Sequence, residues 1–388
     1  KVAAVGGEVV DRQEGGLLFT ARLSALQLLA AAQWDEVLWI DRWTAAERDM
    51  DNARSQSGAN ALESVAGYTD TELFAPDLAV SRGHVYEGLE ANHPDFTTPF
   101  THVGPSGCIG VDAHGHCTAG IIFGNGTSAP QARGLVPDAV GFYTHYVTDV
   151  SSTCAQSPAR NTILGQVVNT HNCMFTTASW GNAVTTAYTS ISADADDIVF
   201  DHRIAWTQSQ SNTGNQNSRP QAWAKNVISV GGFEHFDNSS SADDSWAAGG
   251  GSTGPAADTR NKPDLAAYYD SIWTSDLSGA AGYSLGNSNT SFGGTSGATP
   301  IVAGLNALAI QMFTDSIFSN PARVVGGTRF QNRPYAQTVK ALQIACARML
   351  TPTSTDNRRE HVGWGMPNVY DMYVRRQKIA IVPEDEPI

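Results

Sequence analysis

The chain has 388 residues, of which 41% are hydrophobic and 16% are charged, a composition typical of packed globular proteins and not of disordered ones. Acidic residues outnumber basic residues 38 to 24, and the net charge of −14 disfavours nucleic acid and anionic membrane surfaces as partners. No apolar run reaches the roughly 18 residues that span a bilayer. The sequence opens in mid-pattern with KVAAVGGEVV, so we expect its natural start to be missing.

Residues 1–43 are predicted to form a small α+β unit with the order strand, strand, helix, strand. Its helix is expected to begin after Ser24, a favourable capping residue that precedes the apolar run ALQLLAAA. A unit of this size holds little core, so it should dock on another surface. Residues 44–80 mix charged and small residues without a sustained period, which predicts a linker that wraps the main domain.

Residues 81–375 alternate short apolar strands with helix-like segments, and residues 376–388 resemble a tail. This alternation predicts an α/β domain with a mostly parallel central sheet and helices on both faces. Strands are predicted over 139–148, 175–181, 203–210 and 225–232, and helices over 114–124, 162–172, 296–313 and 338–350. Active sites in such sheets lie beyond the carboxyl ends of the strands.

The stretch GGTSGATP, which contains Ser296, precedes a long apolar helix. A serine at a helix N-terminus lies at the positive end of the helix dipole, and its own N–H is available to an oxyanion. The stretch resembles the serine motif of subtilisin-like proteases, Gly-Thr-Ser-x-Ala-x-Pro, at every fixed position. The resemblance implies a subtilisin-like fold and a nucleophilic Ser296.

A serine nucleophile needs a neighbouring base. The stretch HGHCTAG, from His114 to Gly120, resembles the histidine motif of the same family, His-Gly-Thr-His-Val-Ala-Gly. His114 is therefore predicted to be the base, with His116 as the alternative. The order of acid, histidine and serine along the chain also agrees with subtilisin and differs from that of chymotrypsin-like proteases and α/β-hydrolases.

The acid motif matches the family less closely than the histidine motif does. The family carries an Asp shortly before a His-Pro-Asp sequence, which is present here as His93-Pro94-Asp95. Counting back from His93-Pro94-Asp95 without a gap places Tyr86 at the position of the family's Asp. If this chain has a one-residue deletion, Glu87 lies at that position instead. A carboxylate that orients the histidine is sufficient, so we assign Glu87, with Glu90 and Asp112 as alternatives. A triad without a working acid is a further alternative.

The resemblance also places the substrate cleft. Asn212 is predicted to donate to the oxyanion together with the Ser296 N–H, although Ser211 replaces the glycine of the family, and Asn215 and Asn217 compete for the role. The segment Ser179-Trp180-Gly181 resembles the edge strand that pairs with the backbone of an extended substrate.

Five cysteines cannot all pair with one another. Their spacing predicts two local disulfides, Cys108–Cys117 and Cys154–Cys173, and leaves Cys346 over. Five reduced core thiols are an alternative, and metal ligation by His114, His116 and Cys117 is a weaker one.

The chemistry of such a triad requires no cofactor. Many subtilisin-like proteases bind structural calcium, and Asp95 resembles one of their ligands, but GNGTSAPQARG replaces the familiar loop after the histidine helix. Structural calcium is therefore left open.

The leading hypothesis is a secreted serine endopeptidase, expected to be a monomer, that acts on proteins or peptides. Residues 1–43 resemble the end of a subtilase propeptide, which predicts a zymogen whose own prosegment blocks the cleft until cleavage within 44–60. A catalytically impaired binding protein of the same fold is the first alternative. A peptide ligase that uses the same acyl-enzyme is the second.

Overall fold

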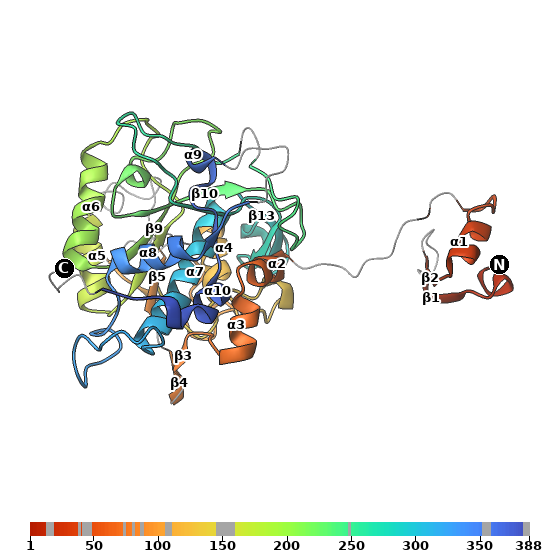
Figure 1. Cartoon of the computed structure of the whole chain (residues 1–388), viewed down its shortest axis with the longest axis horizontal. Coiled ribbons are helices and arrows are strands. Elements are labelled where there is room, and N and C mark those ends of the chain that lie inside the picture. The colour runs from red at the N-terminus through yellow and green to blue at the C-terminus, as the bar shows by residue number, and fades with distance from the viewer. Residues whose placement is uncertain are drawn as a thin grey trace. The chain divides into compact units, whose positions relative to one another are not determined.

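The computed structural model describes residues 1–12, 19–37, 40, 49–72, 75–79, 82–85, 89–104, 111–144, 160–246, 250–350 and 358–382. The chain divides into two compact units, Lys1–Glu47 and Arg48–Ile388 (Figure 1).

The first unit contains a 3-10 helix η1 (Val2–Val5), an antiparallel pair β1 (Glu8–Arg12) and β2 (Phe19–Arg22), and helix α1 (Ala25–Ala31). Ser24 caps α1 as predicted, because its side chain accepts a hydrogen bond from Gln27 N while the Gln27 side chain accepts one from Ser24 N. The final strand predicted within 1–43 lies mostly outside the described residues. Several large apolar side chains of this unit are exposed: Val9, Val10, Leu26, Leu28, Leu29 and Ile40.

The second unit is built on a seven-stranded sheet in the order β11-β10-β9-β8-β5-β7-β6, and every pair of neighbouring strands is parallel. The strands are β5 (Arg82–Val85), β6 (Thr101–His102), β7 (Val140–Tyr143), β8 (Phe175–Ala178), β9 (Ala205–Ser209), β10 (Ile228–Phe233) and β11 (Leu265–Tyr268). This sheet confirms the predicted α/β fold.

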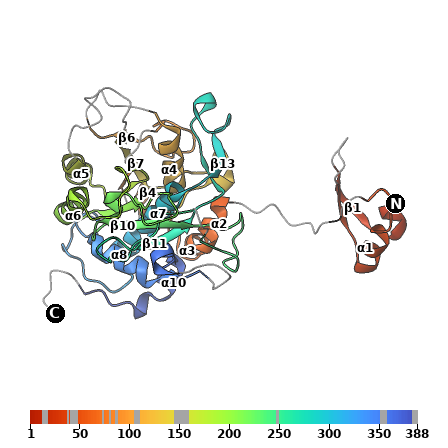
Figure 2. The same ribbon diagram turned by 90° about the horizontal axis from the view of Figure 1, so that it is seen from above.

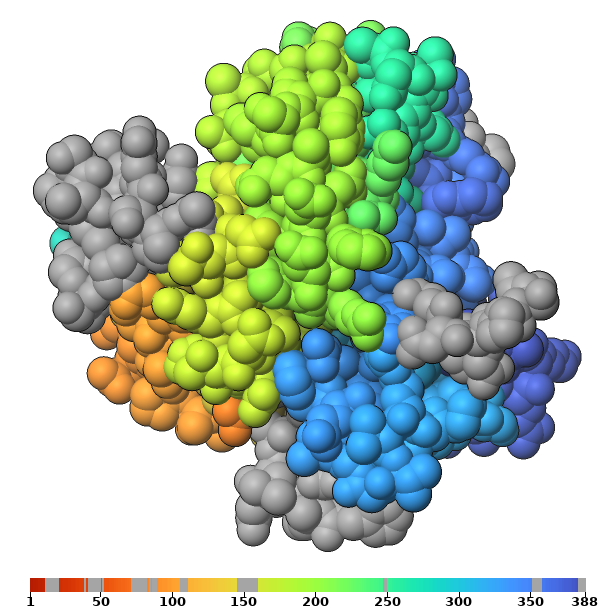
Figure 3. All heavy atoms as spheres, turned by 90° about the vertical axis from the view of Figure 1, so that its left-hand side faces the viewer, coloured from red at the N-terminus to blue at the C-terminus, as the bar shows by residue number. Residues whose placement is uncertain are grey.

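Helices cover both faces of the sheet, and each face has its own apolar core. On one face, α4 (Ala113–Phe123) packs against α7 (Thr295–Thr314), which crosses β8, β9, β10 and β11. On the other face, α5 (Arg160–Asn169) and α6 (Ser190–His202) lie side by side (Figures 1 and 2). Figure 3 shows the surface that these two helices form, in yellow and yellow-green.

Helix α7 is long and apolar enough to cross a bilayer by length and composition alone. The fold accounts for this composition, because 94% of its most apolar window is buried inside the unit. It is the central core helix of the second unit.

The linker predicted over 44–80 differs from the structure. Residues 49–66 form two helices, α2 (Asp49–Gln56) and α3 (Ala59–Ala66), whose Met50, Ala53 and Leu62 are fully buried in the main core. Buried Arg54 fixes α2 by donating to Gly134 O at 2.7 Å and Leu135 O at 3.2 Å. The second unit therefore begins at Arg48 and includes α2 and α3.

The remaining elements complete the second unit. Three antiparallel pairs are β3 (Thr71–Glu72) with β4 (Ala75–Ala79), β12 (Ile272–Ser275) with β13 (Ser288–Phe292), and β14 (Ala347–Arg348) with β15 (Met366–Pro367). The other helices are α8 (Ala336–Ala345), α9 (Arg359–Val362) and α10 (Val369–Val374), and the short 3-10 turns are η2 (Pro130–Ala132), η3 (Pro220–Trp223), η4 (Gly279–Ala281) and η5 (Arg376–Lys378). The predicted tail is thus partly structured, and Ile379 and Ile381 pack against the core.

Candidate active site

Ser296 lies in the first turn of the 20-residue helix α7, as predicted. Gly294 precedes the helix with φ 72°, a left-handed conformation that glycine adopts without strain. Gly293 passes so close to Tyr269 that an added Cβ would lie 2.5 Å from its carbonyl oxygen. The two glycines therefore permit the tight turn that presents Ser296 at the positive end of the helix dipole.

Pro300 explains a further feature of the serine turn. A proline inside a helix has no N–H to donate to the carbonyl four residues earlier, which here is the carbonyl of Ser296. Ser179 Oγ donates to that carbonyl at 3.0 Å instead. Ser296 Oγ in turn donates to Ser179 O at 3.4 Å, a long bond that holds the hydroxyl weakly.

His114 lies in the first turn of α4, which packs against α7. Its ring meets the ring of Phe292 edge-on, with centroids 5.5 Å apart. Phe292 also lies 3.6 Å from the position of a Cβ added to Gly297, the residue after Ser296. The structure therefore gathers the N-terminal turns of α4 and α7 around Phe292, a residue that the sequence analysis did not select although it lies just before the serine motif.

Asn212 follows β9 and is tied to the residue before the nucleophile. Its Oδ1 accepts hydrogen bonds from Thr295 N at 2.9 Å and from Thr295 Oγ1 at 3.0 Å. These bonds fix the amide, so that Nδ2 is the group left to donate, and the residue is exposed. Thr295 thus orients the Asn212 side chain, and only its position in the serine motif signalled this role.

The two competing asparagines are used elsewhere. Asn215 Nδ2 donates to Thr213 O at 3.1 Å, and Asn217 Nδ2 donates to Asn215 Oδ1 at 2.9 Å. Both side chains therefore stabilise the turn that follows Asn212. Ser211 keeps a glycine-like backbone with φ 107°, although it is not a glycine.

The segment after β8 lies beside the serine turn. Besides the two bonds between Ser179 and Ser296, Gln208 Nε2 donates to Trp180 O at 2.6 Å. Gly181 is in close contact with Gln221, whose Oε1 would lie 2.8 Å from an added Cβ. The predicted substrate segment and the predicted nucleophile are therefore brought together.

Of the three acid candidates, Glu87 lies outside the described residues. Asp112 caps α4, where its Oδ1 accepts from His114 N at 2.7 Å and from Gly115 N at 3.4 Å. Glu90 Oε2 accepts from Ser278 N at 3.1 Å. Each alternative carboxylate thus has a structural role of its own.

His116, the alternative base, is buried in the core and not part of the cleft. Its ring lies edge-on to that of His93, with centroids 4.5 Å apart, and its Nδ1 accepts from Glu90 N at 3.3 Å. Burial lowers the pKa of His116 to about 3, with a smaller contribution from His93. A neutral, enclosed imidazole of this kind is a poor general base.

Two metal hypotheses from the sequence involve described residues. Within the described ranges, no cluster of His, Cys, Asp and Glu is arranged to hold a metal ion, so the His114-His116-Cys117 hypothesis has no support. The buried Asp95 accepts from Ser128 N through Oδ1 at 2.5 Å and from Ser275 Oγ through Oδ2 at 2.8 Å. Both oxygens of this carboxylate therefore accept hydrogen bonds from the protein, and structural calcium stays an open prediction.

The two predicted disulfides are corrected by the structure, in which Cys117, Cys173 and Cys346 are buried thiols. Cys117 Sγ donates to Asp276 Oδ1 at 3.8 Å. Burial raises the pKa of the Cys173 thiol, as expected in an apolar core. The partners predicted for Cys117 and Cys173, namely Cys108 and Cys154, lie outside the described residues.

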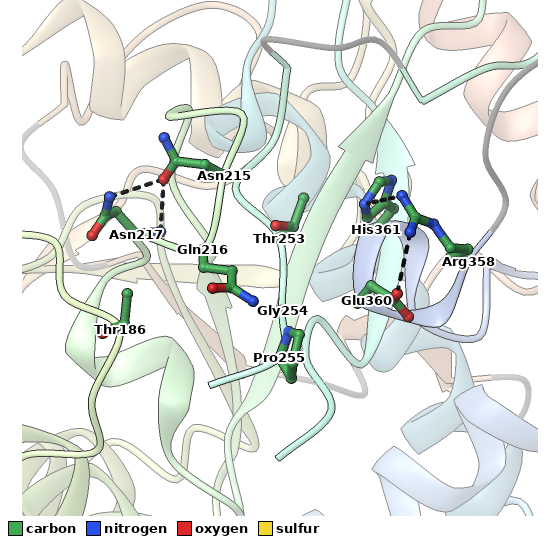
Figure 4. Close-up of a pocket in the computed structure, with 10 residues that line it drawn as sticks. All are labelled: Thr186, Asn215, Gln216, Asn217, Thr253, Gly254, Pro255, Arg358, Glu360 and His361. Carbon is green, nitrogen blue, oxygen red and sulfur yellow. Dashed lines mark hydrogen bonds and ion pairs between the residues drawn. The ribbon is translucent and has the colours of Figure 1, made fainter. Parts of the chain in front are cut away.

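A cavity of about 500 Å³ opens beside the turn that follows Asn212 (Figure 4). On one side of it Arg358 Nη2 donates to His361 Nε2 at 3.3 Å, and Arg358 forms a 3.8 Å ion pair with Glu360. The lining residues are Thr186, Asn215, Gln216, Asn217, Thr253, Gly254, Pro255, Arg358, Glu360 and His361. Of the described residues that were considered for catalysis, the two competing asparagines line this cavity, and Ser296, His114 and Asn212 do not.

Comparison with known proteins supports the fold. The model of the subtilase family matches residues 88–365. The structure of the prenylagaramide maturation protease PagA is similar at a TM-score of 0.60 and 20% identity, covering 83% of this chain and 99% of that one. The structure of the patellamide maturation protease PatA is similar at a TM-score of 0.55 and 19% identity, covering 77% of this chain and 97% of that one. The structure of a lanthipeptide protease is similar at a TM-score of 0.58 and 16% identity, covering 83% of this chain and 92% of that one. Among curated protein sequences, none matches.

Proposed function

Because this chain belongs to the subtilase family, we propose that it is a serine endopeptidase that cleaves protein or peptide substrates through an acyl-enzyme. Ser296 attacks the scissile carbonyl and His114 takes its proton. Asn212 Nδ2 and the Ser296 N–H stabilise the oxyanion, and Glu87 orients His114. The amine then leaves with the proton from His114, water hydrolyses the ester, and no cofactor takes part.

The observation that carries this proposal is the double hydrogen bond from Thr295 to Asn212 Oδ1. A clamp made by the residue directly before Ser296 fixes the amide donor relative to the nucleophile. Preorganised donors of this kind stabilise charge as it develops.

The proposal is tested by expressing the full chain, letting it process, and labelling the prosegment-free protein with a fluorophosphonate. We expect labelling of the wild type and of the control Ser240→Ala, and none of Ser296→Ala. An unlabelled wild type would favour the catalytically impaired binding protein, whose support is the missing Asp of the family motif. A ligase is distinguished by product analysis, because it joins peptides instead of releasing them.

The acid is tested by comparing three isosteric variants. Glu87→Gln is expected to lower kcat by about 10⁴, the loss typical when the orienting carboxylate of a triad is removed. Asp112→Asn keeps a good helix cap and should retain most activity. Glu90→Gln also keeps an acceptor for Ser278 N. A loss confined to one of the latter two would reassign the acid.

We propose that Lys1–Glu47 is an inhibitory prosegment of a secreted, monomeric enzyme. Its exposed leucines, among them Leu26 at 80% and Leu29 at 63%, support a surface that is covered in the zymogen. Because Met50 and Ala53 are fully buried, cleavage should fall before α2, within 44–49 and not across the wider 44–60. N-terminal sequencing of active protein tests this, and an N-terminus at residue 1 would oppose it.

A further inference from the structure

We propose that Tyr283 and Leu285, backed by the buried ring of Phe292, form an apolar wall that selects the substrate residues following the scissile bond. This wall, called the leaving-side wall below, rests on the proposed function and assigns a preference to that same site. It would favour large apolar side chains, such as leucine and phenylalanine, at the first two positions of the leaving peptide.

The first observation is the exposure of two large side chains on one loop. In the loop between β12 and β13, Leu285 is 87% exposed and Tyr283 is 57% exposed. Residues 277–292 contain no charged side chain, although the protein carries a net charge of −14. Two large apolar side chains that are exposed on an uncharged loop are suited to bind apolar groups of a substrate.

The second observation is that the loop is braced from within. The buried Asp276 carboxylate accepts hydrogen bonds from the backbone N–H groups of Leu277, Tyr283 and Ser284, at 2.8, 3.1 and 2.6 Å. Ser284 Oγ donates to Ser288 O at 2.7 Å. The loop thus presents its apolar side chains in a fixed arrangement, which reduces the entropy lost on binding.

The third observation is that the loop is tied to the helix of the catalytic base. Cys117, on α4, donates from Sγ to Asp276 Oδ1 at 3.8 Å, and its carbonyl accepts from Thr274 Oγ1 at 2.9 Å. Tyr283 lies 6.1 Å from Phe292 between ring centroids, and Phe292 lies 5.5 Å from His114. A continuous row of rings therefore leads from the base to the loop.

The chemistry of the reaction assigns this row to the leaving side. The imidazole that takes the serine proton later gives a proton to the departing amine, so that amine must lie next to His114. The residues attached to the amine continue from there. A wall beside the same ring is therefore placed to contact their side chains.

The test uses internally quenched peptides that differ only at the two positions after the cleaved bond, bearing Leu-Phe or Ser-Asp. We expect the wild type to prefer the apolar peptide by about 10- to 100-fold in kcat/KM. Leu285→Ser and Tyr283→Ser should each reduce that preference by about tenfold. Val325→Ser, at a 94% exposed valine that follows α7, is the matched control and should leave it unchanged.

A second substrate separates the two proposals. A peptide methyl ester carries only a methoxy group on its leaving side, so both loop variants should hydrolyse it like the wild type. Two results would overturn the wall alone. One is normal ester hydrolysis with no preference among the quenched peptides, and the other is a preference that survives both substitutions. Failure of the wild type on every substrate, without labelling of Ser296, would overturn the proposed function as well.

Discussion

Thr295 donates two hydrogen bonds to a single atom, Asn212 Oδ1, through its backbone N–H at 2.9 Å and its hydroxyl at 3.0 Å. The same hydroxyl accepts from Ser211 N at 3.2 Å. The residue before the nucleophile thus holds both the side chain and the backbone of the loop that supplies the predicted oxyanion donor. An added Cβ at Gly294 would lie 3.1 Å from Asn212 Nδ2, so the neighbouring glycine leaves room for that amide.

Thr295→Val should lower kcat by about tenfold with little change in KM, because valine keeps the shape but loses one bond that orients Asn212. Asn212→Ala should cost about 10² to 10³ in kcat. In the Asn212→Ala background the threonine substitution should have no further effect, which a double-mutant cycle measures. Thr314→Val, at the far end of α7, is the control, and additive losses would contradict the clamp.

Ser211→Gly should stabilise the protein by about 1 kcal/mol. The substitution removes a backbone strain of about 1–3 kcal/mol that a left-handed conformation imposes on serine. Glycine also gives the unfolded chain more conformational freedom, which opposes this gain but is smaller. Urea unfolding monitored by tryptophan fluorescence would measure the difference. Ser278→Gly is the control, since Ser278 has φ −60° and should lose stability on the same change. Equal effects of the two substitutions would show that Ser211 is not strained.

His116 should make the protein sensitive to acid. Its pKa of about 3 lies below the ordinary value of about 6.5, so between these limits the unfolded chain binds a proton that the folded chain does not. Stability therefore falls as the pH drops from about 6.5, by about 2 kcal/mol at pH 5 from this group. His116→Asn keeps an acceptor for Glu90 N and should show a smaller loss between pH 7 and pH 5. Parallel losses in the two proteins would argue against this role.

Cys117 and Cys173 should behave as shielded thiols, because both are fully buried. Iodoacetamide should leave them unmodified in the native protein and should modify both after denaturation without any reductant. Peptide mass spectrometry gives the extent of modification at each position. Modification that depends on a reductant would restore the disulfide hypothesis.

Local patterns were sufficient to predict the positions of Ser296 and His114 at helix N-termini, since small residues followed by an apolar run define the start of a helix by themselves. The same holds for the Ser24 cap and for the strands around 175–181 and 225–232. These features depend on hydrogen bonds and side-chain periodicity within a few neighbouring residues. The sequence therefore predicted the parallel sheet and the helix starts at which Ser296 and His114 lie.

Only the tertiary structure decided which distant groups meet. It buried Met50 and Ala53 of α2 in the main core, made Asp112 a helix cap, and set Cys117 against Asp276, 159 residues further along the chain. It also placed Tyr283 in the row of rings that begins at His114. Such contacts depend on packing and burial between segments remote in sequence, which no local pattern records. For that reason the sequence predicted a linker where α2 and α3 form and disulfides where Cys117 and Cys173 are thiols, and it did not indicate the contact between Tyr283 and Phe292.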